Sequence, residues 1–100
     1  MKDLTEFNKL EELLKEEGIE YEREDSEEAV IANDHFFWHQ LRSPDNAIYG
    51  EKWKWDVIYG RCSYGQEVGA LEMWGENMNE PEGYMTAEAC LRKIKEILGK

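Results

Sequence analysis

The sequence predicts an α+β domain, in which an antiparallel sheet of four to five strands carries an N-terminal and a C-terminal helix on one face. Two observations predict this class. Apolar residues recur every three to four positions near both ends of the chain, and they alternate with polar residues in the middle. A length of 100 residues corresponds to a single domain, residues 1–100. Four Trp, five Tyr and three Phe favour a packed core, although 35% of the residues are charged.

Both helices are predicted from an apolar stripe and from signals at their ends. The first runs to about Glu17 and ends at Gly18, and Asp3 and Glu6 have the spacing of a capping box at its start. The last begins after Thr86, a good N-cap, and ends at Gly99. The first stripe consists of Leu4, Phe7, Leu10, Leu13 and Leu14, and the last of Ala87, Cys90, Leu91, Ile94, Ile97 and Leu98.

Five segments between the helices read as strands: 19–24, 29–32, 35–41, 53–59 and 70–74. The clearest is 53–59, where Trp53, Trp55, Val57 and Tyr59 share the face that we expect to be packed. We expect turns at 25–26 and 43–46, a glycine-punctuated loop over 60–69 and an acidic loop over 76–83.

Negative charge is concentrated at the start of the chain. The first 28 residues hold twelve acids and four bases, a net charge of −8 out of −11 for the whole chain. Such a surface repels a bare nucleic-acid backbone and attracts a basic protein, so we expect a basic protein partner and no direct contact with nucleic acid.

The acidic stretch from residue 20 to residue 28 is the leading candidate for a partner-binding site. Alternate carboxylates along a strand lie about 7 Å apart, which resembles the phosphate spacing of one nucleic-acid strand. Such a protein could occupy a basic groove as a DNA mimic. The alternative is that the charge only keeps the protein soluble and protects a sheet edge. The candidate residues are Glu20, Glu22, Glu24, Asp25, Glu27 and Glu28.

A second hypothesis is a small-ligand site beside the glycine-rich loop. Tyr64 and Trp74 flank this loop and are candidates for the surface, whereas Trp53 and Trp55 are expected in the core. A pocket made of Tyr64, Gly65, Glu67 and Trp74 could stack on a ligand, either in a monomer or across a homodimer.

No motif predicts catalysis, a metal or a cofactor. His35 and His39 are four residues apart, but in a strand this separation is about 13 Å, too long for one metal ion. Cys62 or Ser63 would need a base, and no local pattern supplies one. The spacing of Gly60, Gly65 and Gly69 fits neither a P-loop nor a dinucleotide fingerprint. We therefore expect a protein that is not an enzyme and binds neither a metal nor a cofactor.

The compartment is predicted from two absences. No apolar stretch of secretory type follows Met1, and two cysteines are few for a secreted scaffold. We expect a cytoplasmic protein with reduced thiols. Its acidic surface also disfavours anionic membranes.

Three segments resemble a group of small proteins, without established activity, encoded by phages and prophages of Gram-positive bacteria. They are Trp55-Asp56, the stretch 63–75 (SYGQEVGALEMWG) and 83–88 (GYMTAE), together with a Leu- and Glu-rich first helix that ends in Gly-Ile. The aromatic-rich segment 35–41 departs from the group. The resemblance implies a phage or prophage setting in a bacterial host cell. Together with the clustered acid it suggests an accessory factor that modulates a basic host protein.

Overall fold

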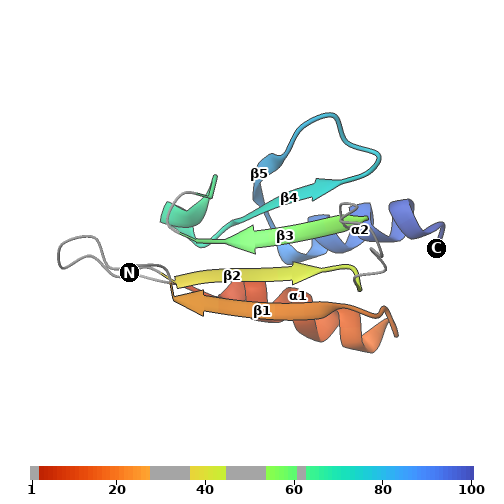
Figure 1. The fold of residues 1–100 in the computed structure, drawn as a ribbon, viewed down its shortest axis with the longest axis horizontal. Coiled ribbons are helices and arrows are strands. Elements are labelled where there is room, and N and C mark those ends of the chain that lie inside the picture. The colour runs from red at the N-terminus through yellow and green to blue at the C-terminus, as the bar shows by residue number, and fades with distance from the viewer. Residues whose placement is uncertain (1–2, 28–36, 45–53, 61–62) are drawn as a thin grey trace.

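The computed structural model describes residues 3–27, 37–44, 54–60 and 63–100, and within it the side chains of 26–27 and 37–38 are not described. Two helices and five strands form an α+β fold (Figure 1). The elements are α1 Thr5–Glu16, β1 Glu22–Glu27, β2 Phe37–Arg42, β3 Trp55–Tyr59, the 3₁₀ helix η1 Gln66–Val68, β4 Leu71–Gly75, β5 Glu82–Met85 and α2 Ala87–Leu98.

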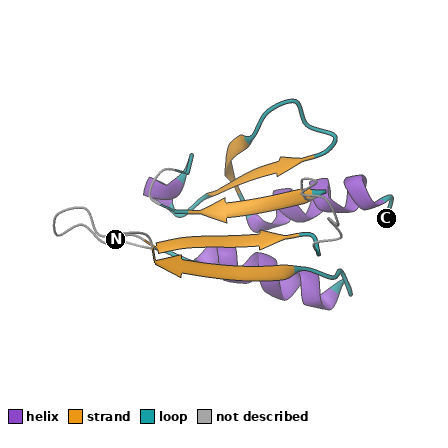
Figure 2. Cartoon of the chain, in the orientation of Figure 1, coloured by secondary structure: helices purple, strands orange, loops and turns teal. Residues whose placement is uncertain are grey.

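The five strands form one antiparallel sheet in chain order, β1-β2-β3-β4-β5. β1 and β5 are therefore its two edges. Both helices lie on the same face of the sheet (Figure 2), and their apolar stripes share one core with the strands. The predicted fold class and the placement of both helices are confirmed.

The core lies between the helices and the inner face of the sheet. β3 and β4 alternate buried and half-buried residues, as strands with one packed face do. Trp55 is completely buried, as predicted, whereas Trp53 lies outside the described residues. The buried apolar residues are Phe7, Leu10, Leu14, Ile19, Leu41, Trp55, Val57, Tyr59, Leu71, Met73, Met85, Ala87, Cys90 and Ile94.

Two predicted connections are wrong. Residues 25–26 do not form a turn but continue β1, where Asp25 pairs with His39 and Ser26 with Trp38 on β2. Inter-strand hydrogen bonding thus overrides the local turn preference of these residues. The predicted loop 76–83 contains the start of β5, in which Glu82 and Met85 pair with Met73 and Leu71. The predicted strand 29–32 and the second half of the predicted turn 43–46 lie outside the described residues.

The predicted N-cap of α2 is confirmed, whereas the predicted capping box of α1 is wrong. Thr86 Oγ1 accepts a hydrogen bond from Ala89 N at 3.2 Å, and Gly99 ends α2 in the left-handed conformation. At α1, Asp3 Oδ1 accepts from Thr5 N, but Glu6 does not complete a capping box. Its carboxylate instead accepts a hydrogen bond from Ala87 N at 2.8 Å, at the start of α2.

Candidate functional site

The predicted acidic residues lie along one edge of the molecule. We call α1, β1 and the residues between them the acidic edge (residues 3–27), where eleven acids and three bases give a net charge of −8. Figure 1 shows α1 and β1 running along the same side of the domain. Arg23 Nη1 on β1 binds Glu11 Oε1 on α1 at 2.7 Å, and the Tyr21 hydroxyl donates to Glu11 Oε2 at 2.8 Å. These contacts hold the strand against the helix.

Two of the predicted residues are partly neutralised on the outer face of the sheet, which carries no helix. Arg42 on β2 forms ion pairs with Glu22 at 3.2 Å and with Glu24 at 2.5 Å. Arg42 also donates to Gln40 Oε1, and Gln40 Nε2 donates to Asp56 Oδ2 on β3, each at 2.9 Å. The sheet thus ties Glu22 and Glu24 into a polar network across three strands.

Asp25 points to the opposite face of β1. Its Oδ1 accepts from Nδ1 of the buried His39 at 2.6 Å, and its carboxylate also accepts from Arg23 Nε. Burial alone would raise the pKa of Asp25, but the hydrogen bonds from His39 and Arg23 outweigh it and lower this pKa below its ordinary value. Strand alternation therefore separates Asp25 from Glu22 and Glu24, so the predicted residues do not form one continuous surface.

Exposed carboxylates of the acidic edge lie on α1 and the turn that follows it as well as on β1, where Glu22, Glu24 and Asp25 are exposed. Glu12, Glu16 and Glu20 are exposed. Glu12 pairs with Lys15 at 3.7 Å, and within the described part of the chain Glu16 and Glu20 form no ion pair. Glu27 continues β1 without a described side chain, and Glu28 lies outside the described residues. The acidic edge therefore includes carboxylates of the helix, although the sequence predicted a site made of strand residues.

A second group, at the opposite edge of the sheet, brings together two of the four predicted ligand-site residues, Tyr64 and Glu67. We define the tyrosine cluster as Tyr64, Val68 and Tyr84, which are the exposed large hydrophobic residues of the described chain, at 66%, 68% and 61% exposure. Tyr84 N donates to Tyr64 O at 3.2 Å, and the Tyr84 hydroxyl donates to Glu67 Oε2 at 2.6 Å. The glycine-rich loop is thereby fastened to β5.

The remaining predicted residues lie beside this cluster with different roles. Gly65 has φ +102°, and a Cβ there would lie 2.9 Å from Tyr84 N, so this glycine permits close packing and does not line an open pocket. Trp74 is half-buried on the outer face of β4, two residues after Glu72. Glu72 Oε1 accepts from Tyr64 N at 2.7 Å.

Sequence reasoning missed Tyr84 and Val68 as members of this site. Tyr84 is the one described residue other than glycine with positive φ, at 55°. A tyrosine in this conformation is strained and is held there by its surroundings. The signal in the sequence was the pair Gly83-Tyr84, which precedes the last helix by two intervening residues.

Cys90 and Ser63 are two described side chains that carry nucleophilic atoms. Burial raises the pKa of Cys90 to about 12, which leaves almost no thiolate. The Ser63 hydroxyl donates to Gly60 O and accepts from Gly60 N, so it caps its own turn. Among the described residues no three His, Cys, Asp or Glu side chains are placed to hold a metal ion. His35 and Cys62 lie outside that part of the chain.

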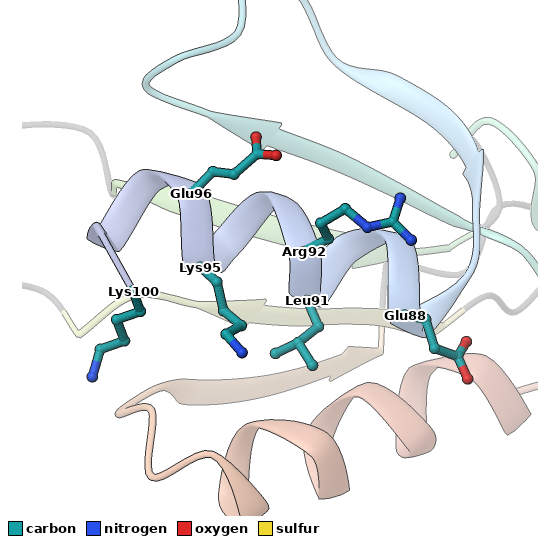
Figure 3. A pocket seen from close by; sticks show the side chains of 6 residues that line it. All are labelled: Glu88, Leu91, Arg92, Lys95, Glu96 and Lys100. Atoms are coloured by element: carbon teal, nitrogen blue, oxygen red, sulfur yellow. The ribbon is translucent and has the colours of Figure 1, made fainter.

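A shallow groove of about 310 Å³ runs along α2 (Figure 3). Its lining residues come from this helix and from Lys100, which follows the C-cap: Glu88, Leu91, Arg92, Lys95, Glu96 and Lys100. Lys95 pairs with Glu17, the C-cap of α1, at 3.0 Å, and Glu88 pairs with Lys9 of α1. Two of its charged groups thus hold the helices together, and the mixed charges favour no particular ligand.

Comparisons with known proteins assign this chain to no family. No protein-family model matches the chain, and neither the curated proteins nor the solved structures gave a match. Within the described residues, no helix has the length and apolar character needed to cross a membrane.

Proposed function

We propose that this chain is a non-enzymatic binding protein whose acidic edge docks on a basic protein surface. The observation that carries the proposal is the net charge of −8 over residues 3–27, which the fold places along one side of the domain. Clustered charge of one sign accelerates encounter with a partner of opposite charge and disfavours the wrong partners.

The contacts within the edge support a rigid docking surface. Arg23 and Tyr21 both bind Glu11, so β1 and α1 keep their carboxylates in a constant arrangement. A preorganised surface loses little conformational entropy when it binds. Because Arg42 already neutralises part of Glu22 and Glu24, we assign the main contact to Glu12, Glu16 and Glu20.

The proposed setting is the cytoplasm of a Gram-positive bacterial host, where the chain acts as a phage or prophage accessory factor. Its partner is a basic host protein, such as a nuclease or a defence component, whose nucleic-acid groove the acidic edge fills as a DNA mimic. This setting rests on the sequence resemblance, and the partner class rests on the charge.

The test compares two double charge reversals that change the net charge equally. Glu16→Lys with Glu20→Lys alters the acidic edge, whereas Glu76→Lys with Glu80→Lys alters exposed residues of the loop between β4 and β5. Each variant and the wild type are immobilised, and basic proteins retained from a Gram-positive lysate are identified by mass spectrometry. The retained protein is then purified, and its affinity is measured at two salt concentrations.

We expect the edge variant to lose at least about tenfold in affinity, because several charge contacts are reversed, and the loop variant to bind as the wild type does. Salt should weaken the wild-type complex. Equal losses in both variants, or retention of no basic protein at all, would contradict the proposal. Far-UV circular dichroism confirms that each variant is folded.

A further inference from the structure

We propose that the tyrosine cluster is a docking site for an arginine-bearing segment of a protein partner. This site lies beside the edge strand β5, and the acidic edge includes β1 at the opposite edge of the sheet. Asp3 of the acidic edge lies beside Gly69 of the η1 loop, but the residues assigned to the main acidic contact, Glu12, Glu16 and Glu20, are not part of the tyrosine cluster. This inference therefore does not depend on the function proposed for the acidic edge.

The three exposed large hydrophobic residues of the described chain belong to this one site. Tyr64 and Val68 belong to the loop around η1, and Tyr84 belongs to β5. All three are more than half exposed, whereas the large apolar side chains of β3 and β4 that face the helices are almost fully buried. Grouped exposed apolar residues that include tyrosines mark contact sites, because a tyrosine ring supplies both apolar area and a polar group.

The cluster is held rigidly. The backbone of Gly83 passes so close to Tyr64 that a Cβ on residue 83 would overlap the Tyr64 side chain, with Tyr64 O only 2.9 Å away. Tyr84 stays in its strained conformation through hydrogen bonds to Tyr64 O and to Glu67. The backbones of both tyrosines and the hydroxyl of Tyr84 are thus held in place before a partner arrives, which lowers the entropic cost of binding.

The charges around the cluster select a cation. Glu67 accepts from the Tyr84 hydroxyl and Glu72 accepts from Tyr64 N, and both donors are neutral. No cation of the described chain pairs with these two carboxylates. The hydrogen bond from Tyr84 also lowers the pKa of Glu67, which keeps it ionised. Two carboxylates beside two exposed phenol rings complement a guanidinium group, which stacks on aromatic faces and binds carboxylates in a fork.

A second copy of this chain is the weaker occupant. It would bring the same carboxylates of two molecules together, each with a net charge of −11. A cationic segment with apolar neighbours satisfies both the carboxylates and the exposed Val68.

The test uses two synthetic peptides, acetyl-Gly-Leu-Arg-Leu-Gly-amide and its twin with citrulline in place of arginine. Citrulline has nearly the same shape as arginine but no charge. Each peptide is titrated to millimolar concentration into the ¹⁵N-labelled full chain, and backbone amide shifts are followed by NMR. We expect saturable shifts at Tyr64, Glu67, Val68 and Tyr84 with the arginine peptide, and binding at least about fivefold weaker with citrulline.

Two variants locate the contact. Glu67→Gln keeps an acceptor for the Tyr84 hydroxyl and removes the charge, so it should weaken arginine-peptide binding by about threefold or more. Tyr84→Gly removes the ring at a position where glycine adopts the backbone conformation without strain, and it should weaken binding to a similar extent. Glu76→Gln, in the exposed loop after β4, is the charge-matched control and should bind as the wild type does.

Three outcomes would overturn the proposal: equal binding of both peptides, shifts confined to the acidic edge, or no shift at millimolar peptide. Concentration-dependent shifts of the same four amides without peptide would also overturn it, because they would show that a second copy covers the cluster. Loss of binding in Glu16→Lys with Glu20→Lys alone would concern the acidic edge and contradict the present assignment.

Discussion

The carboxylate of Glu6 on α1 accepts a hydrogen bond from the backbone N–H of Ala87, the first residue of α2, at 2.8 Å. The first N–H groups of a helix have no partner inside that helix and must be satisfied from elsewhere. Ala87 is completely buried, so water does not replace this acceptor. One helix therefore completes the start of the other, across 81 positions of the chain.

Replacing Glu6 by alanine should destabilise the domain by about 1–2 kcal/mol, because the Ala87 N–H would be buried without an acceptor. Glu6→Gln keeps an amide oxygen at the same place and should lose less than half as much. Urea unfolding followed by tryptophan fluorescence measures both values. Equal losses in the two variants would show that charge, and not the hydrogen bond, matters at this position.

Gly83→Ala should be more costly than Gly75→Ala. A Cβ on residue 83 meets the Cβ and backbone of Tyr64, which cannot move without moving the loop, whereas a Cβ on residue 75 meets the flexible end of Ile97. We expect losses of about 3 and about 1 kcal/mol, respectively. Thermal unfolding of both variants checks the order. Adding Ile97→Ala should remove the steric clash in the Gly75→Ala variant. A greater loss of stability in Gly75→Ala than in Gly83→Ala would contradict the packing described.

Stability should fall in acid partly because of Asp25. Its folded-state pKa is lowered, so its contribution is fully present above the unfolded value of about 4 and is lost as the pH falls through the folded value. Asp25→Asn should therefore show a shallower loss of stability between neutral pH and pH values below about 4. Urea midpoints across that range give the slope. Glu20→Gln, which removes an exposed carboxylate, controls for the loss of one charge.

Ionisation of Tyr21 should reduce the stability of the domain at alkaline pH. Burial, and then the hydrogen bond to Glu11, raise the pKa of Tyr21 to about 12. The stabilisation is complete below the unfolded tyrosine value of about 10 and is lost as the pH rises through the folded value. Tyr21→Phe should abolish the part of the alkaline slope that belongs to this group. Ultraviolet titration at the phenolate band should show one fewer late-titrating tyrosine in that variant.

Periodicity in the chain predicted the parts of the fold in which one face of an element is packed. Leu10 and Leu14 on α1, Trp55 and Val57 on β3, and Ile94 on α2 are all completely buried, as their spacing required. β5 escaped prediction because only Met85 among its four residues is buried, so the strand depends on pairing with β4. The position of Asp25 within β1 was not predicted, because aspartate favours turns and its partner His39 lies 14 residues away along the chain.

The sequence by itself determined the fold class, the ends of the second helix and the concentration of acid in the first 28 residues, because these follow from neighbouring residues and their order. Tertiary structure alone decided that Arg42 neutralises part of the acidic strand, that Asp25 binds His39 and that Tyr64 meets Tyr84. Those contacts join residues 14 to 20 positions apart. Their proximity depends on strand register and loop packing, which local sequence patterns do not specify.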